Sequence, residues 1–155
     1  NEGYIQAGQI QVMSAGRGIR HSEYNKESIE TRLFQIWIEP NELNLEPNYT
    51  TLTDIEFQQN EFTVLASGQT EFLECERPWI HQDVTIKLLK IEKNKSIDFL
   101  FRRSRQWYCV LNKGKLYING NLLREGDGIH IKDEKNLLFE SNEDSELLIV
   151  DLAFT

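Results

Sequence analysis

Hydrophobic and polar residues alternate with a period of two along most of this chain, whereas a helical period is nearly absent. Because successive side chains of an extended strand point to opposite faces, this alternation predicts β-strands. In the second half we expect strands at 62–67, 84–91, 97–101, 107–111, 115–118, around 129, 137–139 and 147–152. Many short strands at such close spacing are typical of an all-β barrel or sandwich.

Tight turns separate several of these predicted strands. Residues 112–114 (Asn-Lys-Gly) and 119–121 (Asn-Gly-Asn) have the composition of β-hairpin connections. The sequence therefore predicts one complete small barrel within residues 59–155.

Residues 1–58 hold too few predicted strands to close a barrel of their own. Residues 10–14 alternate, and residues 31–38 carry apolar side chains on both faces, which predicts a strand that is covered on two sides. Residues 39–53 contain two prolines and several asparagines, so we expect an ordered loop there. Open strand edges invite pairing with another chain, so we expect this first barrel to be incomplete and to borrow strands from elsewhere.

Composition narrows the choice of partners. The chain has 155 residues with 25 acidic and 17 basic side chains, a formal net charge of −8. Such a surface repels phosphate backbones, so we expect no direct binding of nucleic acid. The basic cluster Arg102, Arg103 and Arg105 is interpreted as a solvated strand end or turn.

No stretch predicts a membrane span. The longest apolar run, residues 147–154, is interrupted by Asp151 and is too short to cross a bilayer. Cys75 and Cys109 lack the spacing of a metal site, and Cys109 lies in an apolar run that predicts a buried thiol. A disulfide stays open, but we favour reduced thiols and a cytoplasmic protein without membrane contact.

A histidine and a glutamate two residues apart carry the candidate chemistry. They are His21 and Glu23, and they follow a stretch with glycines at 16 and 18. On an extended chain they would point to the same side. An imidazole with a carboxylate is a ligand combination of non-haem iron and manganese centres. The pair alone leaves a second interpretation open, namely a surface histidine beside a solvated glutamate.

The sequence around this pair resembles the signature of the pirin family. The similar segments are GQIQVMSAGRGIRHSE at 8–23, LFQIWI at 33–38, HQD at 81–83 and GDG at 126–128. Pirins are bicupins, with two jelly-roll (double-stranded β-helix) barrels in one chain. The resemblance implies an all-β cupin fold, in which residues 1–58 are the C-terminal part of the N-terminal, metal-binding barrel. Residues 59–155 then form a metal-free C-terminal cupin barrel, in which Leu137 stands at the usual ligand position.

The same resemblance implies a ligand set. In pirins an earlier His-x-His segment supplies two ligands, and a histidine and a glutamate matching His21 and Glu23 supply the others. This sequence has no His-x-His, so we expect that the N-terminal third of a usual pirin is absent here. The implied cofactor is a divalent transition metal, iron first, with Mn, Ni, Cu, Zn or Co as alternatives. In this shortened chain we expect the metal only if the ligands of the absent His-x-His segment are supplied from elsewhere.

Three functions are consistent with the resemblance. The first is a quercetin 2,3-dioxygenase-type oxidoreductase acting on a flavonol-like molecule and O2, with Glu23 as general base. The second is a non-catalytic, metal-dependent regulatory module that binds a protein partner or a second chain completing the first barrel. The third is an inactive, truncated remnant.

Other candidate groups are weaker. His81 and Asp83 repeat the spacing of the first pair, but the resemblance places them at the domain junction in a hydrogen-bonded role, with metal binding as the alternative. His130 lies between two isoleucines and is expected to face solvent. Ser14 and Ser22 lie near His21, but no acid is placed to complete a hydrolase triad.

Overall fold

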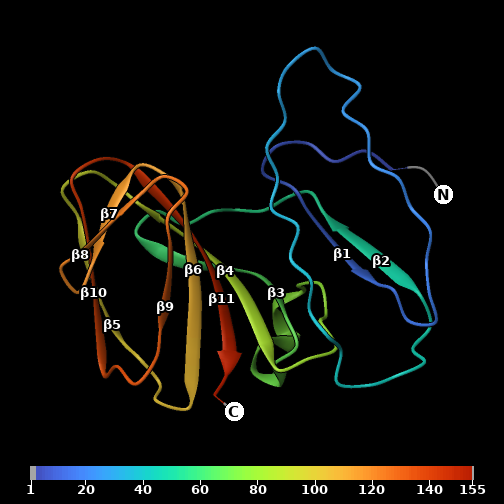
Figure 1. The fold of residues 1–155 in the computed structure, drawn as a ribbon. Helices are drawn as coiled ribbons and strands as arrows, with labels where there is room; N and C mark the ends of the chain where they lie inside the picture. The colour runs from blue at the N-terminus through green and yellow to red at the C-terminus, as the bar shows by residue number, and fades with distance from the viewer. Residues whose placement is uncertain (1–2, 155) are drawn as a thin grey trace.

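The computed structural model describes residues 3–154, apart from the side chain of Cys75, and is almost entirely β. Strands β1 (Ile10–Ser14) and β2 (Asn48–Leu52) pair antiparallel in a small sheet. The other strands form two larger sheets beside it (Figure 1). We call residues 3–58 the N-terminal segment and strands β3 to β11 the C-terminal barrel.

The C-terminal barrel consists of a five-stranded and a four-stranded sheet. Their orders are β3-β4-β11-β6-β9 and β5-β10-β7-β8, and all pairs are antiparallel. The strands are β3 (Glu61–Ser67), β4 (Val84–Ile91), β5 (Ser96–Leu100), β6 (Arg105–Lys113), β7 (Lys115–Ile118), β8 (Asn121–Arg124), β9 (Gly128–Ile131), β10 (Asn136–Ser141) and β11 (Ser145–Ala153). A 3-10 helix, η1 (Thr70–Cys75), lies between β3 and β4. The predicted all-β barrel is confirmed.

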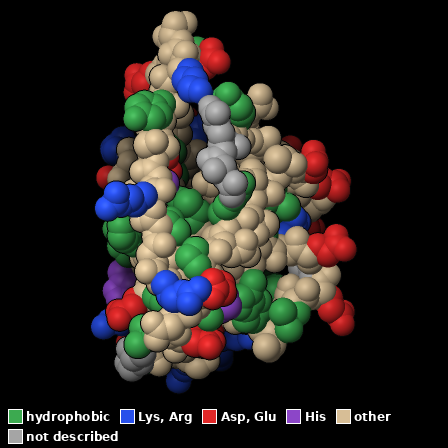
Figure 2. Space-filling view, turned by 90° about the vertical axis from the view of Figure 1, so that its right-hand side faces the viewer, with side chains coloured by type: hydrophobic (Ala, Val, Ile, Leu, Met, Phe, Trp, Pro, Cys, Tyr) green, Lys and Arg blue, Asp and Glu red, His purple; other side chains and the backbone are tan. Residues whose placement is uncertain are grey.

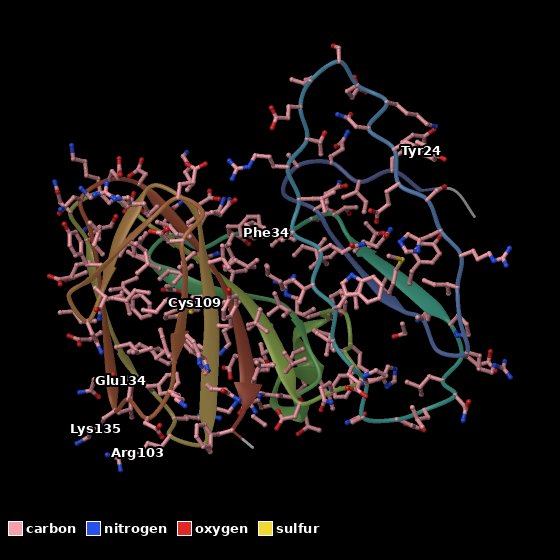
Figure 3. All side chains as sticks on the ribbon, in the orientation of Figure 1. Tyr24, Phe34, Arg103, Cys109, Glu134 and Lys135 are labelled. Atoms are coloured by element: carbon pink, nitrogen blue, oxygen red, sulfur yellow. The ribbon has the colours of Figure 1, made fainter. Side chains whose placement is uncertain are left out.

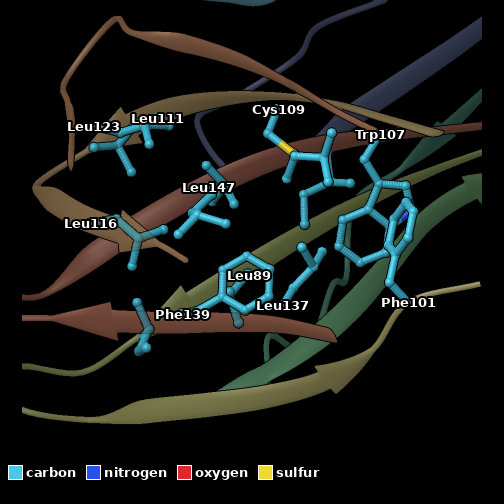
Figure 4. Close-up of a cluster of buried hydrophobic side chains, with 14 residues drawn as sticks. Leu89, Phe101, Trp107, Cys109, Leu111, Leu116, Leu123, Leu137, Phe139 and Leu147 are labelled. Atoms are coloured by element: carbon cyan, nitrogen blue, oxygen red, sulfur yellow. The ribbon is translucent and has the colours of Figure 1, made fainter. Parts of the chain in front are cut away.

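The space between the two sheets is filled by apolar side chains. Trp107, Leu137 and Phe139 are at most 1% exposed. Figure 4 shows these side chains meeting in the interior with leucines from several strands. Phe62 packs edge-on against Trp107, with ring centroids 5.7 Å apart. The expected ligand position of this barrel, Leu137, is thus part of a packed hydrophobic core.

A second hydrophobic cluster covers the outer face of the five-stranded sheet. Along β11, Leu147 and Ile149 belong to the interior core, while Leu148 and Val150 point outward. Ile10, Val12 and Ile38 of the N-terminal segment pack against this outer cluster. The continuous apolar run of β11 is explained by burial on both of its faces.

One predicted hairpin is confirmed and the other is wrong. Asn119 and Gly120, with φ of 48° and 76°, connect β7 to β8 in a two-residue turn. Gly114, with φ of 86°, instead stands where the chain leaves the five-stranded sheet, since β6 and β7 belong to different sheets. A side chain at Gly114 would overlap the backbone oxygen of Asp144. The glycine marks a sharp bend rather than a hairpin.

The strand expected at residues 31–38 is not formed. These residues lie in no β-strand, and no backbone–backbone hydrogen bond involves them within residues 3–154. Leu33 and Trp37 are 65% and 85% exposed, so the expected burial on two sides is also wrong. The stretch is apolar, but a strand needs a neighbouring strand to pair with, and the small sheet contains only β1 and β2.

The loop expected at residues 39–53 contains a strand. Asn48–Leu52 pairs with β1, placing Thr50 opposite Val12. Prolines and asparagines dominate the composition of this stretch, but Tyr49, Thr50 and Thr51 have high β propensity and find a partner. Within residues 3–154 no helix has the length and apolar character of a membrane span.

Candidate metal centre and its surroundings

A glycine-rich turn leads from β1 to the candidate ligands. Gly16 and Gly18 have φ of 51° and 118°, as expected for a chain that must change direction sharply. A side chain at Gly16 would overlap the backbone oxygen of Leu45, so the turn packs closely on the following loop. Arg17 forms an ion pair with Glu46 across the same contact. The route of the chain toward His21 is therefore fixed by close backbone packing.

His21 and Glu23 lie on the same side of the chain. Their Nε2 and Oε1 atoms are 4.0 Å apart, and their side chains are 40% and 51% exposed. The chain around them is irregular and not in a strand, because β1 ends at Ser14. The head groups of His21 and Glu23 therefore lie close together as expected, but they do so on an irregular loop after the glycine turn and not on a strand.

The two head groups fit part of a metal's ligand set. Two donors bound to one first-row ion at about 2.1 Å lie roughly 3–4 Å apart, depending on the angle between them. The observed separation is compatible with that range. Within residues 3–154 no group of three or more His, Cys, Asp or Glu side chains gathers in one place. The described residues therefore bring one imidazole and one carboxylate together at this place.

An apolar cleft lies between the N-terminal segment and the C-terminal barrel. It has a volume of about 310 Å³, and its lining residues are Phe34, Gln35, Ile36, Trp37, Tyr108, Val110, Leu148 and Val150. Figure 3 shows Phe34 near the barrel, whereas Tyr24 lies far out on the N-terminal segment. Neither His21 nor Glu23 lines this cleft. Hydrophobic side chains also reach the outer surface of the N-terminal segment (Figure 2).

The other two histidines have their own hydrogen bonds. His130 is exposed, as expected, and its Nε2 lies 2.9 Å from Oε1 of Gln106. The backbone oxygen of His81 accepts a hydrogen bond of 2.7 Å from the amide of Asn41. The junction contact expected for His81 is thus made by its main chain.

Arg105 is buried, in contrast to the solvated position expected for it from the sequence. It is only 9% exposed, so it is not a solvated strand end. Its Nε donates to Asp151 over 2.7 Å, and its Nη1 donates to Asp83 over 2.6 Å. Lys87 donates to the other oxygen of Asp151 over 2.7 Å. The period-two alternation through Trp107 and Cys109, extended back to Arg105, was the signal that would have placed this side chain inside.

The hydrogen bonds and burial of Arg105 and its partners shift the pKa values of several side chains. Burial disfavours the charge on Arg105, but hydrogen bonds to Asp151 and Asp83 outweigh it and raise the pKa of the guanidinium. Burial opposes the charge on Asp83 too, yet hydrogen bonds from Arg105 and Gln69 lower the pKa of its carboxyl group. Burial, and then the charge of Asp151, raise the pKa of the Cys109 thiol to about 12.

Comparison with known proteins decides the family. Residues 74–152, half of the chain, match the family described as the quercetinase C-terminal cupin domain, and residues 1–38 match the pirin family. The chain belongs to the pirin family. The cupin fold expected from the resemblance is confirmed by the two sheets and by the matching structures.

Bacterial pirin-family proteins are similar along nearly the whole chain. Identity is 36% over 156 residues with quercetin 2,3-dioxygenase of Escherichia coli K12, covering 98% of this chain and 64% of that protein. It is also 36% over 154 residues with a pirin-like protein of Caulobacter vibrioides, covering 99% and 66%. The chain spans 63–66% of the length of these two relatives and of two further bacterial relatives.

Solved structures of a pirin-family protein have the same fold. The crystal structure of YhhW from Escherichia coli matches with a TM-score of 0.89 at 31% identity, covering 100% of this chain and 64% of that one. YhhW in complex with nickel(II) matches with a TM-score of 0.84 at 30% identity, covering 66% of that chain.

Proposed function

We propose that this chain is a metal-binding cupin of quercetin 2,3-dioxygenase type, in which His21 and Glu23 supply two ligands to a divalent transition metal. The observation that carries the proposal is the 4.0 Å separation of the imidazole and carboxylate heads. It is supported by the activity named for the Escherichia coli relative and by the nickel(II) complex of YhhW. The remaining ligands come from outside the described residues.

The proposed division of labour follows the two parts of the chain. Residues 1–58 would be the C-terminal part of a metal-binding barrel, and residues 59–155 a metal-free barrel that supports it. The hydrophobic filling around Leu137 and Trp107 supports the second assignment, because it leaves the interior to packed side chains. We propose iron as the first metal, with Mn, Ni, Cu, Zn or Co as alternatives. Affinity alone follows the order Fe < Co < Ni < Cu and does not select iron.

Each ligand has a separate role in the proposed chemistry. When bound, the cation acts as a Lewis acid that lowers the pKa of a flavonol hydroxyl and favours its oxyanion. His21 offers the lone pair of Nε2 in the neutral imidazole. Glu23 lies on the same side and is half exposed, so its free carboxylate oxygen can accept the hydroxyl proton as general base. The proposed co-substrate is O2.

Titration with paramagnetic Mn²⁺ tests the ligand assignment without requiring turnover. In ¹⁵N-correlated NMR spectra of the wild-type chain, amide signals of residues 20–24 should broaden before those of the C-terminal barrel. His21→Ala and Glu23→Gln should each abolish this selectivity. His130→Ala removes another exposed imidazole, from the C-terminal barrel, and should leave the selectivity unchanged. If the broadening survives in His21→Ala, the assignment is wrong.

A binding role without catalysis is the second candidate. The observation that favours it is the exposed apolar stretch around Leu33 and Trp37, whose backbone is unpaired within residues 3–154. Such a stretch can accept a strand from a protein partner or a second chain. Oxygen consumption with quercetin, measured beside light-scattering mass in solution, separates the two candidates. Uptake of oxygen above the metal-free control supports the enzyme, whereas a stable complex without uptake supports the binding role.

A further inference from the structure

Two polar attachments join the N-terminal segment to the C-terminal barrel at the ends of residues 32–41. At one end Arg32 pairs with Glu125 over 2.7 Å, with side chains 64% and 49% exposed. At the other end the amide of Asn41 donates to the backbone oxygen of His81, and the Gln82 side chain donates to the backbone oxygen of Glu39 over 2.9 Å. The second attachment therefore depends on the position of loop 80–83.

Asp83 fixes that loop to the interior of the barrel. Its carboxylate accepts from Arg105 over 2.6 Å and from Gln69 over 3.0 Å. Its backbone amide donates to the side chain of Gln82 over 2.9 Å, the same side chain that reaches Glu39. A continuous series of hydrogen bonds thus runs from buried Arg105 through Asp83 and Gln82 to the N-terminal segment.

The carboxylate of Asp83 balances the charge of a buried group formed by Arg105, Lys87 and Asp151. Arg105 and Lys87 both share the single buried carboxylate of Asp151, and their side chains are 10% and 12% exposed. Without Asp83 this group carries two cations and one anion. A buried, uncompensated charge is costly, so the barrel interior attracts the carboxylate of loop 80–83.

Backbone packing supports the same loop from the other side. A side chain at Gly68 would overlap the backbone oxygens of Gln82 and Ile80. The amide of Ile80 donates to the backbone oxygen of Ser67 over 3.0 Å. Loop 80–83 is therefore held both by the Asp83 carboxylate and by close contact with glycine.

We propose that Asp83 is a latch through which the buried charges of the C-terminal barrel hold the N-terminal segment in place. Neutralising Asp83 releases loop 80–83 from Arg105, and loop 80–83 then releases Glu39 and Asn41. The Arg32–Glu125 pair at the opposite end is exposed and contributes little by comparison. This role goes beyond the proposed metal chemistry and holds whether or not a metal binds.

Amide hydrogen exchange measures the latch directly, because the Asn41 amide is one of its hydrogen bonds. In Asp83→Asn we expect the Asn41 amide to exchange about tenfold faster or more, since a charge-assisted hydrogen bond is worth about 1.5–3 kcal/mol. Amides in β11 and at residues 85–91 of β4 should keep their wild-type rates; the Val84 amide is left out because it donates to the backbone oxygen of Gln82 in the loop. Glu125→Gln, which removes the other attachment, should change the Asn41 rate by less than about fivefold.

A second variant tests the same loop without altering charge. Gly68→Ala forces loop 80–83 away from β3, so it should also accelerate exchange at Asn41. An unchanged Asn41 rate in Asp83→Asn overturns the latch, and so does equal acceleration of all amides, which would show general support of the barrel. An unchanged rate in Gly68→Ala overturns the transmission through the loop. None of these readouts depends on His21 or metal, so failure of the metal proposal leaves them intact.

Discussion

The buried charges around Asp151 predict an unequal response to two substitutions. Asp151 is 5% exposed and accepts hydrogen bonds from both Arg105 and Lys87. Asp151→Asn leaves two buried cations with only the half-exposed Asp83, which is hydrogen-bonded to Arg105, for compensation. Removing one partner of a buried ion pair costs about 3–5 kcal/mol. Against a total stability of roughly 8–15 kcal/mol for a chain of this size, that loss is large.

Arg105→Met should cost less than Asp151→Asn. It removes one cation, leaves Lys87 paired with Asp151, and returns Asp83, whose side chain is 53% exposed, to solvent. We expect a loss of about 1–3 kcal/mol, because a long apolar side chain keeps part of the packing. The double variant should be less destabilised than the sum of the two single variants, since it removes opposite charges together.

Urea denaturation followed by tryptophan fluorescence measures these differences, with Trp107 in the core as one of the reporters. The midpoint should fall in the order wild type, Arg105→Met, Asp151→Asn. Glu71→Gln breaks an exposed pair with Arg102 and serves as the control, with little expected change. If Arg105→Met is as destabilising as Asp151→Asn, or if the single effects simply add, the charge-balance reasoning is wrong.

Two further predictions follow from the shifted pKa values. The pKa of Asp83 is lowered in the folded state, so its contribution is present above the ordinary carboxyl pKa and is lost as pH falls through the lowered value. Asn41 exchange, corrected for intrinsic rates, should thus differ between wild type and Asp83→Asn at neutral pH and converge in strong acid. The pKa of Cys109 is raised to about 12, so in a Cys75→Ser background its thiol should react with Ellman's reagent at pH 8 only after denaturation. Reaction at the rate of a free thiol in the native protein would contradict its burial.

The sequence predicted the C-terminal barrel well because its strands carry the period-two signal and find partners within the chain. The run from Val84 to Ile91 is one such strand. The Asn119–Gly120 turn was also predictable, because its residue types favour a two-residue hairpin connection. The same signal failed at residues 31–38, where alternation is strong but no adjacent strand is present to pair with. It failed in the opposite sense at Asn48–Leu52, where pairing with β1 overrides a loop-like composition.

The candidate metal pair was accessible to sequence reasoning, but the charge group was not. His21 and Glu23 are two residues apart, so their spacing alone suggested that their head groups lie together, although an irregular loop and not a strand brings them there. Asp83, Arg105 and Asp151 come from three distant segments, and only the sheet order joins them. A cluster of arginines usually indicates a solvated surface. The sequence therefore did not indicate that the side chain of Arg105 points inward.

The double-sided burial of β11 has a consequence for how the strand finds its correct register. Because both of its faces are apolar, a slip by one residue would exchange leucine, isoleucine and valine for one another and carry only a small hydrophobic penalty. Such a slip would move both ionisable residues of the strand, Glu146 and Asp151, to the opposite face, and it would take Asp151 away from Arg105 and Lys87. The carboxylate of Asp151 therefore helps to fix the register of a strand whose apolar pattern alone does not specify its pairing.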